Sequence, residues 1–588
     1  MKRSSAGHNI KLNGIAASAG IAIGKVFKLS GDVIKVEERS ISSDQIAHEV
    51  KKLIKALEVT KRELAEIQKQ AKTKTGKEGE DIFDAHQSIL EDHVVIEETI
   101  EQIKEQKKNA DFIYNQVMQG FQDSLQTLDD EYFRGRVADI KDVKRRLIKN
   151  IQGGETRLLN NLTQKAVIIA YDLTPSDTVL LDRQKIIAFL TDKGGKTSHA
   201  AIMARSMGIP SVVGLENITN SVRTGDTVII DGISGAVIVN PTSSVLNKFL
   251  KLRAEYDELT KDLSKFRNLP CRTLDGKDVE LSANLDFLDE INSIINYGAR
   301  GVGLFRTEYL YLKSDKLPTE EQEFAEYLKT AEKLYPHPVI IRTLDIGGDK
   351  TARCLPMPHE DNPMLGWRAI RICLENPKLF KSQLRAILRA SIKGNVKLLL
   401  PMISSLDEIY KAKAIIDQVK GDLTSQNIPF DDKIEIGAMI EIPSAAIMAD
   451  AIAEEVDFLS IGTNDLIQYT AAVDRTNLRV AHLYDRLPPA VLRLVKNVVD
   501  AGHRKGVWVG MCGEMAGDPL ATLILLGLGL DELSVSPAML LEVKKIIRMV
   551  TFSDSRKIAE KALQMKTSMQ IERYIRNVMT TRYKLKIN

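Results

Sequence analysis

The run Asp457-Phe458-Leu459-Ser460-Ile461-Gly462-Thr463-Asn464-Asp465 combines a short apolar strand pattern with a polar end. Similar runs recur through the same half of the chain, and helical patterns separate them. In all, eight runs begin near Val279, Gly301, Val339, Val396, Ile434, Asp457, Gly506 and Glu532. Eight β units that alternate with helices are what a (β/α)8 barrel requires. We therefore predict such a barrel over residues 271–588, with its reactive groups at the C-terminal ends of the strands.

Unusual polar residues follow five of the predicted strands. The segments are Phe305-Arg306-Thr307-Glu308, Ile341-Arg342-Thr343, Ile440-Glu441-Ile442-Pro443, Gly462-Thr463-Asn464-Asp465 and Met511-Cys512-Gly513-Glu514, and Arg475 lies shortly after the sixth strand. A single arginine or glutamate is usually a solvated surface charge. Two arginines, a glutamate and an Asn-Asp pair at successive strand ends instead predict a binding site.

The residue types of this set indicate the chemistry of the site. Guanidinium groups suit carboxylates and phosphates, with which they form paired hydrogen bonds. Mg²⁺ commonly takes one or two protein carboxylates together with substrate oxygens, and Glu441 and Asp465 suit that role. Most cysteines are small buried hydrophobic residues, which is our interpretation of the other three in this chain. Cys512 differs because it ends the seventh predicted strand, where it is a candidate proton donor.

A second candidate site lies in Gly194-Gly195-Lys196-Thr197-Ser198-His199-Ala200. Thr197 and Ser198 are good capping residues and helix-forming residues follow them, so His199 is predicted in the first turn of a helix. A helix start favours an anion, and the two glycines allow the backbone to approach it. A lone histidine there is often only a hydrogen-bonded side chain near the cap, but the setting also suits a histidine that carries a phosphoryl group.

The N-terminal half is predicted to be an α/β domain interrupted by helices. Strand-like patterns occur in residues 11–35 and again between 167 and 239. Over about 44–150, apolar residues recur at three- and four-residue steps, which indicates amphipathic helices, and the pattern breaks too often for a coiled-coil arm. The predicted domains are 1–43 with 151–240 (α/β), 44–150 (inserted helices), 241–270 (linker helix) and 271–588 (barrel).

Composition narrows the function classes. The 588 residues include 82 Lys and Arg and 79 Asp and Glu, and the formal charge of +3 gives no global reason to expect nucleic acid or an acidic membrane. The four cysteines form no CxxC pair, which is typical of a reducing cytosol. No apolar stretch reaches the length that crosses a bilayer. We expect a cytoplasmic protein that neither binds nucleic acid nor inserts into a membrane.

The pattern from Thr191 through the glycine pair and His199 to Ile209-Pro210-Ser211-Val212-Val213-Gly214 resembles the phosphohistidine domain of the phosphoenolpyruvate-utilising enzymes. Together with the barrel motifs, nearly the whole chain resembles Enzyme I of the bacterial sugar phosphotransferase system. The resemblance implies a multidomain α/β protein, in which a split phosphohistidine domain with an inserted helical subdomain precedes the barrel. It also implies an enzyme that moves the phosphoryl group of phosphoenolpyruvate to its own histidine, releases pyruvate, and passes the group to a histidine of the carrier protein HPr.

The resemblance assigns roles to individual residues. The phosphorylated histidine falls on His199, the threonine that contacts it on Thr178, and the proton donor on Cys512. The magnesium ligands fall on Glu441 and Asp465. The phosphoenolpyruvate ligands fall on Arg306, Arg342, Asn464, Asp465 and Arg475, with Arg368 as a further active-site arginine. The residues that support the phosphohistidine fall on Gly194, Gly195, Thr197 and Ser198.

Partners are implied in the same way. HPr is expected to dock on the helices of 44–150, and a homodimer is expected to form through the barrel domain. Three departures from the family pattern are visible: Lys196 replaces an arginine, Ala200-Ala201 replaces a hydroxyl residue, and Met364 replaces an aromatic residue. None of them removes a group that the chemistry needs, although Lys196 lacks the bidentate fork of arginine.

Two alternative functions share parts of these motifs. A phosphoenolpyruvate synthase or pyruvate phosphate dikinase has the same histidine and barrel, but it needs a large nucleotide-binding domain. The chain has neither a Walker A pattern nor enough unassigned residues for that domain. A regulatory paralogue acting on a nitrogen-type carrier is expected to carry an N-terminal sensor domain, for which residues 1–40 leave no room. The phosphotransferase is therefore the leading hypothesis.

Overall fold

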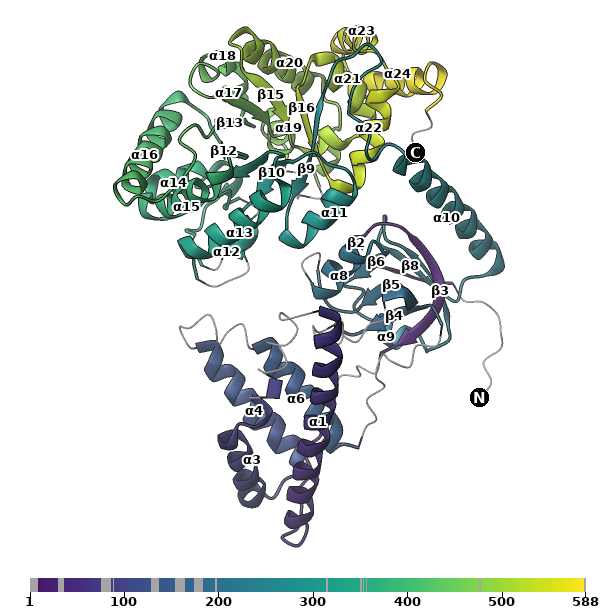
Figure 1. Ribbon diagram of the computed structural model, residues 1–588. Coiled ribbons are helices and arrows are strands. Elements are labelled where there is room, and N and C mark those ends of the chain that lie inside the picture. Colours follow the sequence, from purple (N-terminus) through teal and green to yellow (C-terminus); the bar gives the residue numbers. More distant parts are fainter. Residues whose placement is uncertain are drawn as a thin grey trace. The chain divides into compact units, whose positions relative to one another are not determined.

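The computed structural model describes residues 9–29, 36–75, 86–87, 89–127, 137–153, 164–173, 183–195, 198–312, 316–348, 350, 352, 354–355, 357–474, 477 and 479–585. The chain divides into two compact units, Met1–Glu258 and Leu259–Asn588 (Figure 1). The division falls inside helix α10 (Ser243–Ser264), within the range predicted for the linker. The finer division into four domains stays a prediction.

A mixed sheet of eight strands organises the first unit. The strands are β1 (Ile10–Asn13), β2 (Ile15–Ser18), β3 (Ile21–Lys28), β4 (Ala166–Ala170), β5 (Ile186–Thr191), β6 (Ser211–Val213), β7 (Thr227–Asp231) and β8 (Ala236–Val239). Their order is β1-β8-β7-β3-β4-β5-β6-β2, and β3 to β6 run parallel. Helix α8 (His199–Met207) connects β5 to β6, so it begins beyond the carboxyl end of β5. The short α9 (Ile218–Ser221) follows β6.

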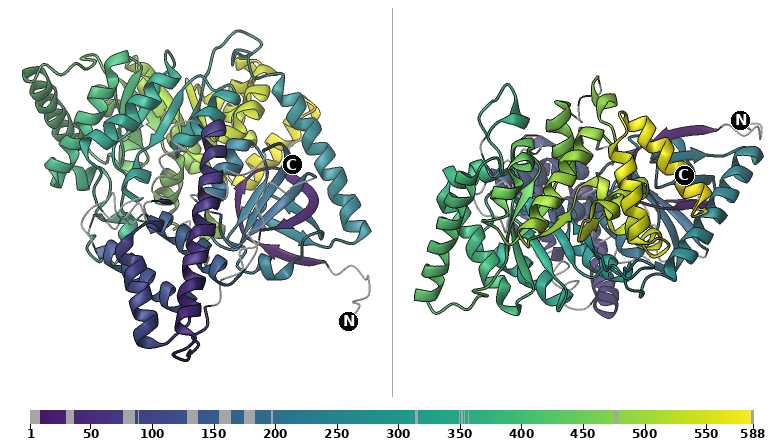
Figure 2. Two further views of the ribbon diagram at one scale, coloured as in Figure 1. Left: turned by 60° about the horizontal axis from the view of Figure 1, so that its bottom comes forward. Right: turned by 90° about the horizontal axis from the view of Figure 1, so that it is seen from above.

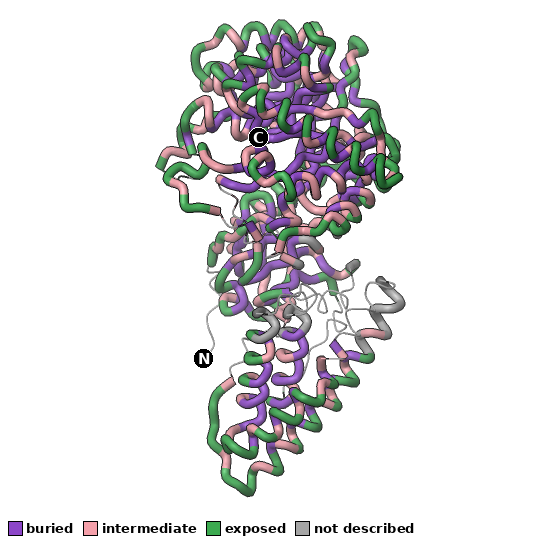
Figure 3. The backbone as a smooth tube through the Cα atoms, turned by 90° about the vertical axis from the view of Figure 1, so that its left-hand side faces the viewer, coloured by how far each residue is buried: buried purple, intermediate pink, exposed green. Residues whose placement is uncertain are grey.

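Four helices are inserted between β3 and β4 in the sequence: α1 (Ile46–Thr75), α3 (His93–Gln106), α4 (Ala110–Thr127) and α6 (Val137–Ile151). Leu53, Ile103, Ile113 and Leu147, one from each helix, lie in a common core. Buried and exposed positions alternate along these helices, as an amphipathic pattern requires (Figure 3). Glu49 joins two of them, because its carboxylate accepts a 2.9 Å hydrogen bond from the backbone N–H of Ala110.

A closed parallel barrel forms the second unit. Its strands are β9 (Glu280–Leu285), β10 (Val302–Arg306), β11 (Val339–Arg342), β12 (Val396–Leu400), β13 (Ile436–Ile440), β14 (Phe458–Ile461), β15 (Trp508–Met511) and β16 (Glu532–Val535). Each strand pairs with the next, and β16 pairs with β9 to close the barrel. Every strand coincides with one of the eight predicted runs, so the (β/α)8 prediction is confirmed.

Helices surround the barrel strands (Figure 2). They are α11 (Ile291–Asn296), α12 (Glu308–Leu312), α13 (Glu320–Leu334), α14 (Ile370–Glu375), α15 (Pro377–Ala390), α16 (Leu406–Ser425), α17 (Pro443–Ile447), α18 (Ala449–Ile452), α19 (Thr463–Ala471), α20 (Pro489–Arg504), α21 (Pro519–Leu528), α22 (Leu540–Arg548), α23 (Phe552–Leu563) and α24 (Ser568–Thr581). Among the described residues of both units, no helix is long and apolar enough to cross a membrane.

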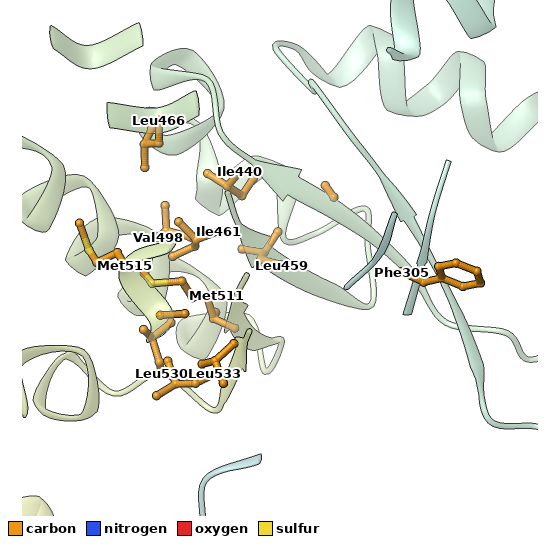
Figure 4. Packing of buried hydrophobic residues seen from close by; sticks show 14 of the residues in the cluster. Phe305, Ile440, Leu459, Ile461, Leu466, Val498, Met511, Met515, Leu530 and Leu533 are labelled. Carbon is orange, nitrogen blue, oxygen red and sulfur yellow. The ribbon is translucent and has the colours of Figure 1, made fainter. Parts of the chain in front are cut away.

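The side chains of each barrel strand alternate between two cores. On β14, Leu459 and Ile461 belong to the large core between strands and helices, where Figure 4 shows them near Val498 of α20. Phe458 instead belongs to a small cluster inside the barrel. Because successive side chains of a strand point to opposite faces, Ser460 lies on the same interior side as Phe458.

Candidate functional site

The alternation of the strands directs three predicted charged residues to one place. Arg306 and Arg342 end β10 and β11, and Glu441 follows β13 directly. The side chains two positions before them all belong to the interior cluster of the barrel: Leu304, Ile340 and Met439. With a strand period of two residues, the charged side chains point to the same interior side at the carboxyl edge of the barrel. Cys512 belongs to the interior cluster itself.

A buried ion cluster surrounds Arg342, whose side chain is 6% exposed. Its guanidinium pairs with Glu308 and lies 3.1 Å from Asp345 Oδ2. Lys350 Nζ donates to the same two carboxylates, over 2.6 Å to Glu308 Oε1 and 3.0 Å to Asp345 Oδ2. Burial disfavours the Asp345 carboxylate, but the surrounding cations outweigh burial and hold the pKa of Asp345 well below its usual range.

Arg368 extends this cluster toward the sixth strand end. Its Nη2 donates to Asp345 Oδ1 over 2.9 Å and lies 3.4 Å from Asp465 Oδ2, and its Nη1 donates to the Tyr469 hydroxyl over 3.2 Å. The Nε atoms of Arg342 and Arg368 are buried and have no hydrogen-bond partner within the described part of the chain. Both guanidinium groups are thus held by carboxylates and still have N–H groups to offer.

The backbone around Arg368 has positive φ angles at Gly347 and Ala369. Gly347 has φ +114°, and a Cβ there would collide with Arg368 Cβ and lie 2.8 Å from Arg368 Cα. Ala369 has φ +52° and ψ −124°, a conformation that non-glycine residues rarely adopt and that costs on the order of 1–3 kcal/mol. The surrounding contacts therefore hold Arg368 in place at the expense of local strain.

Glu441 is 1% exposed and accepts a 2.6 Å hydrogen bond from the backbone N–H of Met402. Burial, followed by the negative charges of Asp465 and Asp345, raises the pKa of Glu441 to about 8. A neutral carboxylic acid is therefore the favoured form at pH 7. A cation beside Glu441 would reverse this balance by stabilising the carboxylate.

Glu441 and Asp465 satisfy the donor requirement for Mg²⁺. They are two carboxylates near enough for the charge of one to raise the pKa of the other. Within the described ranges, no group of three or more His, Cys, Asp or Glu side chains forms a metal cage. A Mg²⁺ ion on these residues would therefore take its remaining ligands from water or from oxygens of a bound substrate, as Mg²⁺ commonly does in proteins.

Cys512 lies just after β15 and is 2% exposed. The Ser460 hydroxyl donates to its sulfur over 3.5 Å, and the side-chain amide of Asn284 donates to its carbonyl oxygen over 3.2 Å. Burial raises the pKa of the Cys512 thiol to about 11, although the Ser460 hydrogen bond and the charge of Arg342 oppose the shift. The group is thus a thiol at neutral pH, in the form that can give up a proton.

Two further predicted residues border the site. Arg306 is 34% exposed and donates to Asp286 Oδ1 over 2.9 Å, so it is the more accessible of the strand-end arginines. Asn464, in the first turn of α19, accepts a 2.9 Å hydrogen bond at Oδ1 from the backbone N–H of Glu514. This bond orients the amide of Asn464 from the neighbouring strand end.

The first unit carries the predicted histidine site. Helix α8 begins at His199, and Ser198 Oγ caps it by accepting from the Ala201 N–H over 3.4 Å, as the sequence predicted. Gly194 has φ +106°, and a Cβ there would lie 2.8 Å from Ser198 Cβ, so a larger residue would displace the cap. The next residue, Gly195, accepts a 3.0 Å hydrogen bond from the Ser198 N–H. The first N–H groups of a helix have no intrahelical partners, so this end offers donors to an anion.

Some predicted site residues lie outside the described ranges. They are Thr178, Thr197 and Arg475, together with Lys196. Of His199, only the backbone belongs to the description.

The sequence did not single out Asp345, which pairs with Arg342 and Arg368, or Lys350, which pairs with Asp345 and Glu308. It also did not single out Tyr469, which contacts Arg368, or Ser460 and Asn284, which contact Cys512. The run Leu344-Asp345-Ile346-Gly347-Gly348 offered a usable signal, since an acidic residue and two glycines directly follow the third strand. Ser460 offered none, because a serine inside a strand pattern is usually structural.

Buried guanidinium groups beside paired carboxylates, at the carboxyl edge of a closed parallel barrel, define a barrel enzyme for a small anionic substrate. Family models agree with this class. Residues 13–136 match the N-terminal domain of PEP-utilising enzymes, 162–235 match their mobile domain, and 260–552 match their PEP-binding domain.

Relatives cover almost the full chain. A phosphoenolpyruvate-protein phosphotransferase of Geobacillus stearothermophilus is 44% identical over 97% of this chain and 98% of its own length. Those of Haemophilus influenzae and Bacillus subtilis are each 43% identical over 96% of this chain and over 98% and 99% of their own lengths. A solution structure of an Enzyme I protein is 41% identical and covers 42% of this chain and 99% of that one, with a TM-score of 0.37. The chain belongs to the phosphoenolpyruvate-protein phosphotransferase family.

Proposed function

We propose that this protein transfers the phosphoryl group of phosphoenolpyruvate to His199, releases pyruvate, and passes the group to a histidine of an HPr-type carrier. The observation that carries the proposal is the buried cluster of Arg342, Lys350 and Arg368 with its carboxylates at the barrel edge. Guanidinium forks recognise the carboxylate and the phosphate of such a substrate.

Charge balance supports a metal ion at the same place. The cluster pairs three cations, Arg342, Lys350 and Arg368, with three carboxylates, Glu308, Asp345 and Asp465. Glu441 is a fourth carboxyl group, with its pKa at about 8. An anionic substrate therefore brings charge that this cluster does not neutralise. Glu441 and Asp465 would hold Mg²⁺, which would supply positive charge to the phosphoryl oxygens and the developing enolate.

Transfer of the phosphoryl group is mainly positioning and neutralisation of charge. Four side chains orient the substrate: Arg342, Arg368, Arg306 and Asn464. Of these, Arg342 and Arg368 are fixed by Asp345, and Arg306 is more exposed. Arg475 is proposed as a further ligand. The burial of the cluster keeps water away from the charges, which strengthens these interactions.

Departure of the phosphoryl group leaves an enolate that needs a proton on its methylene carbon. Cys512 is proposed to supply it. Its thiol is protonated at neutral pH, lies on the interior side of the barrel and feels the charges of Arg342 and Arg306. Proton transfer from such a positioned acid contributes about 10²- to 10⁴-fold in rate.

His199 is the proposed acceptor, supported by the helix start, the cap at Ser198 and the close approach of Gly194 to it, with Thr178 and Thr197 as proposed neighbours. His199 and the barrel belong to different units, so each cycle requires them to meet and separate, a type of motion that usually takes microseconds to milliseconds. The inserted helices are the proposed carrier-docking surface, and the barrel the proposed dimer contact. The four free cysteines favour the cytoplasm.

Phosphoenolpyruvate labelled in its phosphoryl group tests the proposal. With Mg²⁺, the protein should take up label in an acid-labile, base-stable bond, and His199→Ala should take up none. His93→Ala is the matched control, because His93 is also the first residue of a capped helix, and it should label normally. Label retained by His199→Ala would refute the assignment. The labelled protein, mixed with candidate carriers, then identifies the next acceptor.

A further inference from the structure

The sulfur of Cys512 has one hydrogen-bond donor from a side chain in the described structure, the hydroxyl of Ser460 on the neighbouring strand β14. The two atoms are 3.5 Å apart, and Ser460 is fully buried. The other side chains of the interior cluster are apolar: Leu304, Ile340, Leu399, Met439 and Phe458. A charge that forms on this sulfur would therefore lie beside an apolar wall, with the Ser460 hydroxyl as its side-chain hydrogen-bond donor among the described residues.

Protonation of the enolate creates such a charge. The S–H bond of Cys512 breaks and leaves its electron pair on sulfur. The proton forms a C–H bond with the methylene carbon, using the electron pair of the enolate C=C bond, while the enolate C–O becomes the ketone of pyruvate. The product on the protein is a thiolate, which later regains a proton from solvent.

We propose that Ser460 is a positioning residue for this step, whose hydroxyl holds the Cys512 sulfur toward the substrate and stabilises the thiolate that proton transfer leaves behind. The inference rests on the proposed role of Cys512 and adds a second residue to it. In the resting protein, the thiol proton has an acceptor in the Ile461 carbonyl oxygen, 3.8 Å from the sulfur, so it is directed away from the Ser460 donor.

Other groups around the sulfur do not replace Ser460. Arg342 and Arg306 stabilise a thiolate electrostatically, and Glu441 opposes it. Both arginines pair with carboxylates, and the side-chain hydrogen bond to the sulfur in the described structure comes from Ser460. Asn284 reaches the backbone carbonyl of Cys512 and not its sulfur. Hydrogen bonds to a charged group are the strong ones, so loss of this donor should have a measurable cost.

Exchange of the methyl hydrogens of pyruvate in D₂O, with Mg²⁺, measures the reverse proton transfer without involving His199. Ser460→Ala should slow this exchange about 10- to 100-fold, while KM for phosphoenolpyruvate changes less than about twofold. Ser460→Thr restores a hydroxyl and should recover most of the rate. Ser282→Ala is the matched control, because Ser282 is also a fully buried serine on a barrel strand, and it should exchange normally.

Each other outcome is decisive. Wild-type exchange in folded Ser460→Ala would refute the proposal. Equal losses in Ser460→Ala and Ser460→Thr, with a raised KM, would assign Ser460 a purely structural role and would also refute it. Cys512→Ser should lose exchange; if it exchanges like the wild type, the proposed role of Cys512 fails, and the inference fails with it for that distinct reason.

Discussion

Arg368 donates a 2.9 Å hydrogen bond to Asp345, and neither side chain is more than 2% exposed. Asp345 also pairs with Arg342 and Lys350, so one carboxylate holds three cations at the barrel edge. Removal of a single partner from a buried ionic group leaves uncompensated charge, which is far more costly than the loss of a surface pair.

Asp345→Asn should therefore lower the free energy of unfolding of the barrel by about 3–5 kcal/mol, measured by urea denaturation. Asp278→Asn is the control, because Asp278 pairs with Arg272 in a largely exposed position. That variant should unfold at an unchanged urea concentration. Equal stability of Asp345→Asn and the wild type would show that the cations do not depend on this carboxylate.

Metal binding should release protons. The pKa of Glu441 is about 8, so this group is mostly neutral at pH 7 and must ionise to hold Mg²⁺. Calorimetry in buffers of different ionisation enthalpy should show about 0.9 proton released per Mg²⁺ at pH 7, and affinity should rise with pH up to about 8. Glu441→Gln should abolish the release. Binding that is independent of pH between 6 and 8 would contradict the assignment of Glu441 as a ligand.

Gly347→Ala should impair substrate binding in addition to stability. The added methyl group collides with Arg368 at a position with φ +114°. Gly506→Ala is the matched control, because Gly506 also has positive φ, at +75°, but a Cβ there meets no described atom within 4 Å. Both variants should lose stability from the backbone conformation, by about 1 kcal/mol or more. Only Gly347→Ala should raise KM for phosphoenolpyruvate, measured by steady-state pyruvate formation.

The barrel should lose stability as the pH rises toward 8. Burial raises the pKa of Glu532 to about 7, although a hydrogen bond from Ser282 opposes the shift. The folded state therefore holds a proton that the unfolded state releases at lower pH. This contribution is complete below the unfolded pKa near 4.5 and is lost as the pH rises through 7, at up to about 1.4 kcal/mol per pH unit.

Glu532→Gln removes this titration. Urea unfolding of the variant at pH 5, 6, 7 and 8 should show a flatter pH dependence than the wild type. Glu255→Gln, an exposed change on α10, should keep the wild-type slope. Identical slopes in all three proteins would mean that Glu532 does not titrate in this range.

The sequence was sufficient to predict the barrel strands and the polar residues at their carboxyl ends. Apolar runs such as Val396–Leu400 are short, regularly separated and bounded by helical patterns, so their number and type could be counted. Arg306, Arg342, Glu441 and Cys512 could be selected because a barrel gathers its strand ends at one edge. The cap at Ser198 followed from local chemistry, which depends on neighbours in the sequence.

The partners of these residues could not be predicted, because they depend on three-dimensional packing. Lys350 lies in a loop after the third strand, and Tyr469 lies within α19, yet both contact the arginine cluster. The hydrogen bond from Ser460 to Cys512 joins residues 52 positions apart in the sequence. The pKa shifts of Glu441 and Asp345 arise from burial and from several charges at once, which a motif does not report.

The side chains of β14 alternate between two cores, and this alternation restricts insertions and deletions in the strand. A substitution on that strand changes one side chain, but deletion of one residue would turn every residue beyond it to the opposite face. Leu459 and Ile461 would then point into the barrel interior, and Ser460 would enter the apolar layer against α20. Insertions and deletions should therefore be absent from this strand in functional variants, even where side chains differ. The alternation of inward and outward side chains along this four-residue strand is therefore as necessary to the site as the arginines.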